Sequence, residues 1–315
     1  MGAFEFQKFD PADKKLNYQS RNGETRVGDI LSVQNLASAR FVLIGISENV
    51  GPQANLGKPG SEHAFHAFTK VFFNTQVHHH LAIHQIAYLG VIKQVKDPSN
   101  RPEACEFVQE LDAFVFDVLK AYLLPTQIPI IIGGGHNNAL PLIRWAAQKE
   151  QISVLNIDAH ADLRTTDKRH SGNSFSFALQ EGLVKQYGVF GLHEAFNNEF
   201  IRDFLNRENI SFRFFEDYLK GSNEFYKDVL AFVEHQNAPI GLEIDMDAIA
   251  YMPSSAMSPS GWALDDIRSF ILKLDPSKGQ IAYLNLTEAA PINEREELMV
   301  GKALSYLVRD FCRTV

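Results

Sequence analysis

The chain has 315 residues, of which 45% are hydrophobic and 22% charged, and its formal net charge is −8. This composition is typical of a soluble globular protein with a large core. The negative charge and the lack of any Lys/Arg cluster argue against a nucleic-acid partner, and no apolar run is long enough to span a membrane. The two cysteines lie far apart, which argues against a disulfide framework or a thiolate zinc site. We expect a cytoplasmic protein without a signal peptide.

Predicted strands and helices alternate along the chain after an N-terminal arm. Residues 1–36 are polar and weakly patterned, and we expect an extended arm with little regular structure. Amphipathic helical patterns, such as those at 102–124 and 263–274, separate most of the predicted strands. Strands that alternate with helices and are apolar on both faces indicate a parallel sheet covered on both sides, here in a single α/β domain over residues 1–315. The predicted strands, about eight in number, are runs of β-branched and aromatic residues at 39–47, 86–92, 128–135, 152–158, 187–193, 210–215, 238–245 and 279–287.

Three of these strands end in residues that can carry chemistry. In an open parallel sheet, ligands bind beyond the carboxyl ends of the strands, so these ends are where a site is expected. Three glycines at 133–135 allow a sharp turn before the first of these residues. The chemistry-bearing residues are, in chain order, His136, then Asp158, His160 and Asp162, and finally Asp245 and Asp247.

The two aspartate motifs place residues two positions apart, which in an extended segment lets them face one point. Buried carboxylates are costly unless they are paired or bound to metal, and two divalent cations would neutralise four of them. A ligand set dominated by oxygen, with imidazole in the minority, suits manganese, and two such ions can share and activate a water. An isolated Asp-X-Asp is more often a loop or a helix cap, but three motifs at three strand ends favour a binuclear metal site.

The motifs Gly-Gly-Gly-His (133–136), Asp-Ala-His-Ala-Asp (158–162) and Glu-Ile-Asp-Met-Asp (243–247) resemble the three signatures of the ureohydrolase superfamily, which includes arginase, agmatinase and formimidoylglutamase. The resemblance runs from about residue 40 to the C-terminus. It implies a three-layer αβα fold with an eight-stranded parallel sheet, two Mn²⁺ ions, and hydrolysis of a C–N bond in an amidino or guanidino substrate. It further implies a trimer or hexamer, and a ligand set of His136, Asp158, His160, Asp162, Asp245 and Asp247.

The same resemblance assigns residues to substrate binding and proton transfer. Glu288 matches the glutamate that holds the cationic nitrogens of the substrate, the alternative being an ordinary buried ion pair. Asp162 would take the proton of the attacking water and pass it to the departing amine. Ser-Gly-Asn (171–173) matches a segment in which arginase has a proton-carrying histidine two residues later, where this chain has a phenylalanine. Asn173 is therefore a candidate substrate contact. His170 is a candidate substitute proton carrier, or else a solvent-facing loop residue.

Arg164 separates the branches of the superfamily. The segments 158–164 and 171–175 look more like the formimidoylglutamase branch than like arginase. A guanidinium can hold a carboxylate in a two-pronged pair, and N-formimidoylglutamate carries two carboxylates, whereas agmatine carries none. The alternative for Arg164 is a salt bridge to Asp158, Asp162 or a surface acid. We predict hydrolysis of N-formimidoyl-L-glutamate to L-glutamate and formamide, a step of histidine degradation. The alternatives are a guanidino hydrolase that releases urea and a catalytically silent binding protein on the same fold.

Overall fold

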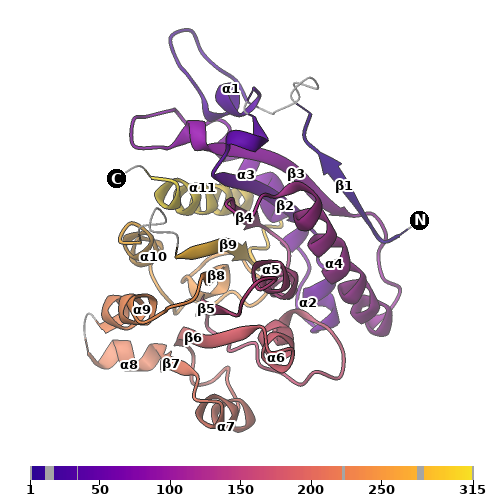
Figure 1. Ribbon diagram of the computed structural model, residues 1–315, viewed down its shortest axis with the longest axis vertical. Helices are drawn as coiled ribbons and strands as arrows, with labels where there is room; N and C mark the ends of the chain where they lie inside the picture. The colour runs from indigo at the N-terminus through magenta and orange to yellow at the C-terminus, as the bar shows by residue number, and fades with distance from the viewer. Residues whose placement is uncertain (1, 11–17, 34, 222–223, 275–279, 314–315) are drawn as a thin grey trace.

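The computed structural model describes residues 2–10, 18–33, 35–221, 224–274 and 280–313. These residues form a single sheet flanked by helices (Figure 1). Every strand predicted from the sequence is present, and one more precedes them. The strands are β1 (Phe4–Lys8), β2 (Phe41–Ser47), β3 (Ile86–Gln94), β4 (Ile128–Ile132), β5 (Ile152–Ile157), β6 (Val184–Leu192), β7 (Ser211–Phe214), β8 (Ile240–Asp245) and β9 (Ile281–Thr287).

Helices connect most of these strands, and the two helical patterns predicted from the sequence correspond to α4 and α10. Within the described residues, none of the helices is both long and apolar enough to cross a membrane. The α-helices are α1 (Val27–Leu31), α2 (Val50–Ala54), α3 (Ala64–Phe72), α4 (Arg101–Tyr122), α5 (Ala139–Ala146), α6 (Ser174–Gln180), α7 (Glu199–Arg207), α8 (Phe215–Lys220), α9 (Glu224–Glu234), α10 (Leu264–Ile271) and α11 (Glu294–Phe311).

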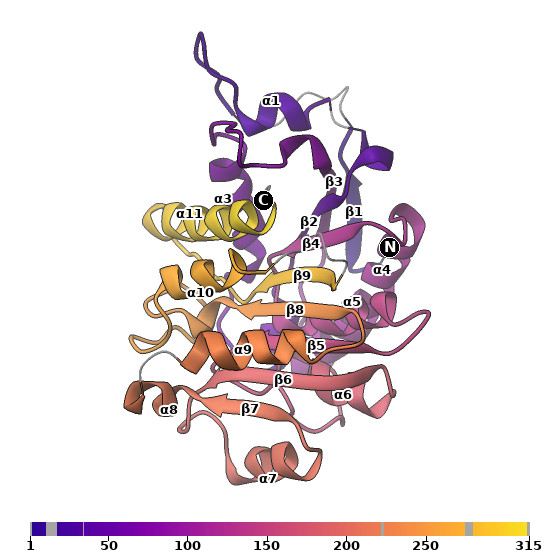
Figure 2. The ribbon, with the colours of Figure 1, turned by 60° about the vertical axis from the view of Figure 1, so that its left-hand side comes forward.

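The order of strands in the sheet is β1-β3-β2-β4-β9-β8-β5-β6-β7. Strands β2 to β9 pair in parallel, as predicted, whereas β1 runs antiparallel to β3. Figure 2 shows β9, β8, β5, β6 and β7 following one another along the sheet. The strands that carry the three motifs are β4, β8 and β5, and only β9 lies among them. Their carboxyl ends therefore lie near one another, at the middle of the side of the sheet where the parallel strands end. We call this side the carboxyl edge of the sheet.

Each face of the sheet has its own hydrophobic core, which gives the predicted three-layer αβα arrangement. Successive side chains of a strand point to opposite faces, so Leu155 of β5 belongs to one core and its neighbour Val154 to the other. The core around Leu155 includes Phe68 of α3, Phe270 of α10 and Leu304 of α11, and the core around Val154 includes Val108 of α4, Leu140 of α5 and Ala178 of α6.

The N-terminal arm is more regular than the sequence analysis predicted. Residues 4–8 form β1 and residues 27–31 form α1, while residues 11–17 and 34 lie outside the described part. Phe4 pairs with Gln94 of β3, and its ring packs against Phe107 of α4 with centroids 6.4 Å apart. The partners that order this segment are distant in the chain, so its own weak pattern did not reveal the strand.

Candidate metal centre

The six residues predicted to bind metal come together at the carboxyl edge of the sheet. Their potential ligand atoms form two groups, and within each group the atoms lie within 4.8 Å of one another. Asp158 belongs to both groups. The first group is His136, Asp158, Asp162 and Asp245, and the second is Asp158, His160 and Asp247.

A tight turn after β4 brings His136 into this cluster. Gly133 and Gly134 have φ values of 92° and 73°, a left-handed conformation that favours glycine. A side chain at Gly133 would lie 2.9 Å from the Ile46 carbonyl, and one at Gly134 would lie 2.6 Å from a Glu48 oxygen. The glycines thus let the chain turn within a crowded space before the short 3₁₀ helix at His136–Asn138 begins.

The aspartate motifs converge for a different reason from the one predicted. Alternation in an extended strand was expected to align them, but β5 ends at Ile157 and a 3₁₀ helix follows Asp245. Instead, Asp158 accepts a hydrogen bond from the His160 N–H at 2.7 Å, and Asp245 accepts one from the Asp247 N–H at 2.8 Å. Each aspartate therefore closes a turn that bends the next ligand back toward it.

His136 faces three carboxylates with one nitrogen. Its Nδ1 lies 3.2 Å from Asp158 Oδ2, 3.0 Å from Asp162 Oδ2 and 3.2 Å from Asp245 Oδ2. One N–H cannot point at three oxygens, and neither nitrogen of this buried ring makes an aligned hydrogen bond. A cation bound by this nitrogen and the three carboxylate oxygens would satisfy all four atoms.

His160 makes the corresponding contacts in the second group. Its Nδ1 lies 3.1 Å from Asp247 Oδ2 and 3.6 Å from Asp158 Oδ1. Asp158 thus directs one oxygen to each group, which is the arrangement expected of a ligand shared by two ions. Asp162 has a φ of 50°, a strained value for a residue other than glycine, and such strain is common at functional sites.

The four carboxylates of this cluster carry more negative charge than its two histidines can balance. Burial lowers the pKa of His136, but the close approach of the Asp158, Asp162 and Asp245 carboxylates outweighs it and raises that pKa well above its ordinary value. Burial, followed by the charges of Asp247 and Asp158, raises the pKa of the Asp245 carboxyl well above its ordinary value. Without bound metal, His136 and Asp245 therefore tend to keep their protons, which offset the negative charge that divalent cations would otherwise neutralise. Four carboxylates with two imidazoles form a donor set that Mn²⁺ accepts, so these residues fit such a centre.

Glu288 follows β9 and lies beside this cluster. Its Oε1 accepts a hydrogen bond from the His136 N–H at 2.8 Å, and its Oε2 accepts one from the Ser255 hydroxyl at 2.5 Å. Burial raises its pKa to about 7, although these two hydrogen bonds act in the opposite direction. The alternative of a buried ion pair is not observed, because no cationic side chain of the described residues contacts Glu288. Its φ of 63° is again a left-handed value.

Arg164 lines the same cavity as the acidic cluster. The cavity has a volume of about 210 Å³, and Arg164 is the only Lys or Arg among the described residues that line it. The salt bridges considered as an alternative role for Arg164 are not found among the described residues, and its side chain is exposed. The arginine is therefore available to an anionic ligand. The other charged or polar side chains of the lining include Asp162, Asp245, Asp247, Glu288, Ser171 and Asn55.

Asn173 is occupied by contacts within its own loop. The residue is fully buried, its oxygen accepts hydrogen bonds from Arg169 and from the His170 N–H, and its amide donates to the Thr165 and Lys168 carbonyls. Arg169 is held in turn by Asp112 in a buried two-pronged pair. A substrate contact by Asn173 would require this network to open.

His170 is 8% exposed, so it is not a solvent-facing residue, and it is not among the residues that line the cavity. Burial, followed by the positive charges of Arg164 and Arg169, lowers its pKa to about 4. Its Nδ1 accepts a hydrogen bond from the Gly172 N–H at 3.1 Å. The ring is therefore neutral near pH 7 and is a weak base, which favours a structural role in the loop.

We accordingly expect His170→Ala to retain kcat within about threefold, equivalent to ~0.7 kcal/mol. The variant should lose about 1 kcal/mol of unfolding free energy, because the cap on the short helix at Ser171–Asn173 is removed. Steady-state kinetics and thermal unfolding measure the two effects separately. A large fall in kcat at unchanged KM would instead show that His170 carries a proton.

Two buried glutamates that were not predicted as site residues lie beside the cluster. Glu48 accepts hydrogen bonds from the Gly135 N–H and the Asn138 amide, each at 2.8 Å, and so fixes the turn before His136. Glu243, within the third motif, accepts from the Tyr283 hydroxyl and the Asn285 amide, each at 2.7 Å, and lies 3.5 Å from Nε2 of His136. Glu243 belongs to the third motif, whereas Glu48 belongs to none of the three motifs.

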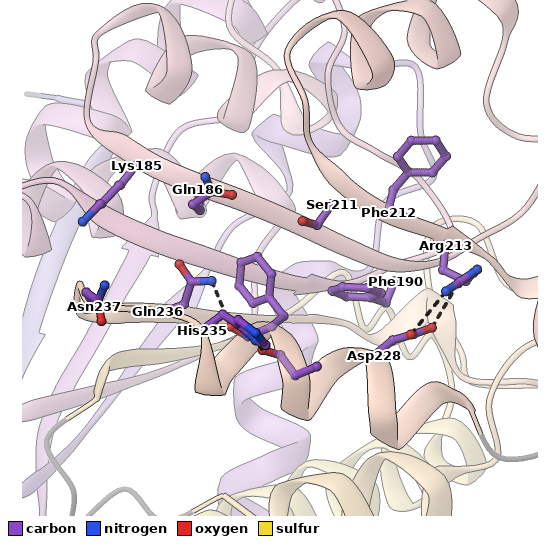
Figure 3. A pocket seen from close by; sticks show the side chains of 12 residues that line it. Lys185, Gln186, Phe190, Ser211, Phe212, Arg213, Asp228, His235, Gln236 and Asn237 are labelled. Carbon is purple, nitrogen blue, oxygen red and sulfur yellow. Dashed lines mark hydrogen bonds and ion pairs between the residues drawn. The ribbon is translucent and has the colours of Figure 1, made fainter.

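A larger cavity, of about 560 Å³, lies between α9 and strands β6 and β7 (Figure 3). Its charged residues include Lys185 and an ion pair between Arg213 and Asp228 at 3.0 Å. None of the six predicted ligands lines it. The smaller cavity at the carboxyl edge of the sheet is therefore the one that combines concave shape with a cluster of potential ligands.

A comparison of the sequence with protein-family models gives the same class of protein as the fold and the acidic cluster. Residues 39–312 match the model of the arginase family. Because this match covers most of the chain, the chain belongs to the arginase family, and the resemblance inferred from the three motifs is confirmed.

Within that family, the chain is similar to formimidoylglutamases. It is 23% identical to the formimidoylglutamase of Streptococcus pyogenes over 290 residues, which cover 88% of this chain and 85% of the relative. A formiminoglutamase structure from Trypanosoma cruzi with Mn²⁺ has a TM-score of 0.72 and 19% identity, and the match covers 92% of this chain and 99% of that one. The formimidoylglutamase structure from Bacillus subtilis has a TM-score of 0.74 and 17% identity, and covers 93% of each chain.

Proposed function

We propose that this protein is a binuclear manganese hydrolase that cleaves N-formimidoyl-L-glutamate to L-glutamate and formamide. Water adds to the amidine carbon, the bond from that carbon to the glutamate nitrogen breaks, and this nitrogen leaves as the amine. The observation that carries the proposal is the presence of Arg164 in the same cavity as the two ligand groups. The similarity to curated formimidoylglutamases supports the same substrate.

The metal part of the proposal assigns one Mn²⁺ to each ligand group, with Asp158 shared between them. When bound, the two cations would supply an activated water and stabilise the negative charge on its attacking oxygen. The chemistry of the donor set supports manganese over metals that prefer thiolates. The proposed ligands are His136, Asp158, Asp162 and Asp245 for one ion, and Asp158, His160 and Asp247 for the other.

The remaining roles belong to residues around the cluster. Asp162 has 13% of its side chain exposed, so it can take a proton at its carboxylate and pass it to the departing nitrogen. The Glu288 carboxylate binds the amidinium, and its hydrogen bonds to Ser255 and to the His136 N–H fix its orientation. Arg164 pairs with a substrate carboxylate and so sets the distance from that carboxylate to the reacting carbon.

The metal content of the intact protein tests this proposal. After dialysis against Mn²⁺ and removal of the excess, we expect close to two manganese ions per chain. Chelation should abolish the release of glutamate from N-formimidoylglutamate, and added Mn²⁺ should restore it. A content near zero in the folded protein would favour the catalytically silent alternative.

A further inference from the structure

The loop that follows β6 holds the backbone around His160. Asn197 is 4% exposed, and its Oδ1 accepts a hydrogen bond from the Ala161 N–H at 3.0 Å. Its Nδ2 donates to the Ala159 carbonyl at 3.0 Å and to the His193 carbonyl at 2.9 Å. Since Ala159 and Ala161 flank His160, one amide side chain fixes the chain on both sides of this histidine.

The neighbouring residue, Phe196, contacts the imidazole of His160 itself. The two rings are stacked, with centroids 5.3 Å apart and an interplanar angle of 17°. Phe196 also stacks on His193 at 5.0 Å and 11°, and His193 stacks on Phe215 at 5.0 Å and 4°. Phe215 is buried in the core, so a row of rings connects His160 to a fixed part of the fold.

His160 needs such support more than the other proposed ligands do. Its side chain is 28% exposed, whereas that of Asp162 is 13% exposed and that of Asp247 is 3% exposed. The side chains of His136, Asp158 and Asp245 are likewise at most 3% exposed. The buried ligands are confined by the core around them, but His160 lines the open cavity. Groups outside the ligand set that orient a ligand commonly change metal affinity by 10–100-fold.

We infer that Phe196 and Asn197 are positioning residues for His160. Asn197 fixes the backbone of His160 and Phe196 fixes its ring, so that Nδ1 remains directed at Asp247 and Asp158. The inference rests on the proposed metal centre and makes a selective prediction. Loss of either contact weakens the ion bound through His160, while the ion bound through His136 keeps its affinity.

Manganese titration of the full-length protein, followed by calorimetry or electron paramagnetic resonance, tests this selectivity. For Asn197→Ala and Phe196→Leu, we expect one Mn²⁺ to bind as in the wild type and the other roughly 10–100-fold more weakly. Phe196→Tyr keeps a stacking ring and should restore wild-type affinity. Asn198→Ala is the matched control, because Asn198 caps α7 by accepting from the Ile201 N–H and, among the described residues, has no hydrogen bond to the His160 segment. It should bind both ions normally.

Amide hydrogen exchange in metal-free protein gives an independent result. The peptide that contains Ala161 should exchange faster in Asn197→Ala than in the wild type, and Asn198→Ala should leave its exchange unchanged. Equal weakening of both ions in Asn197→Ala, or unchanged binding of both together with unchanged exchange, would overturn the inference. If the wild type bound no manganese, the proposed function would fail instead. The exchange of Ala161 would still decide whether Asn197 holds this segment.

Discussion

Asp158→Asn should lower kcat/KM by at least about 10³-fold, a loss of ~4 kcal/mol in transition-state stabilisation. Asp158 is the one residue common to both ligand groups, so its replacement weakens both ions at once. The substitution preserves size and the buried position, but the amide presents only one neutral oxygen. Metal analysis of the dialysed variant should give fewer than two Mn²⁺ per chain, and steady-state kinetics should show the fall.

The stability of the same variant separates loss of metal from loss of fold. Burial raises the pKa of the Asp158 carboxyl, but in the metal-free protein Asp158 faces His136 and His160, which hold that pKa below its ordinary value, so its neutralisation should lower the metal-free Tm. The rise in Tm that Mn²⁺ produces in the wild type should be largely absent. Asp203→Asn, on the exposed side of α7, is a matched control that should keep both ions and full activity. Full activity of Asp158→Asn with two bound ions would contradict the assigned centre.

Arg164→Ala should lower kcat/KM for N-formimidoylglutamate by roughly a hundredfold. A charge-assisted pair at a partly desolvated site is worth about 2–3 kcal/mol, and each ~1.4 kcal/mol is a factor of ten. Arg164→Lys should recover only part of this loss, because an ammonium cannot reproduce the two-pronged geometry of a guanidinium. The effect should appear mainly in KM, since the substrate carboxylate is held in the ground state as well as in the transition state.

The control for Arg164 is another exposed arginine. Arg207 pairs with Glu208 at 3.0 Å and does not line the cavity, so Arg207→Ala should leave kcat/KM unchanged. If Arg164→Ala also left the kinetics on an acidic amidine unchanged, the arginine would have no part in substrate binding.

The sequence predicted the sheet and the coming together of the three motifs well because both depend on local patterns. The apolar runs that became β4, β5 and β8 are buried along their whole length; the first two motifs follow their strands directly, and the third begins within β8. The strand order then places the segments that carry His136, Asp158 and Asp245 near one another, and the turns after the strands complete the convergence. This is why the convergence was predicted correctly although its reason, alternation in an extended strand, was wrong.

Features that depend on distant partners were not predictable in this way. Phe4 joins the sheet through β3, and Glu48 stabilises a turn far along the chain. Asn197 and Phe196 belong to no motif, and their significance follows from their contacts with Ala159, Ala161 and His160. Similarly, the pKa of His170 depends on which arginines surround it in the fold, so its sequence position alone made it a plausible proton carrier.

The substrate preference of the manganese-loaded wild type is the decisive test of formimidoylglutamase activity. Equal concentrations of N-formimidoyl-L-glutamate, arginine, agmatine and guanidinobutyrate should be assayed in parallel for release of glutamate, urea and amine. We expect the highest kcat/KM with N-formimidoylglutamate, a lower value with arginine, and none measurable with agmatine, which offers Arg164 no carboxylate. Efficient hydrolysis of agmatine, equally fast in Arg164→Ala, would rule out this substrate assignment and place this chain among the guanidino hydrolases.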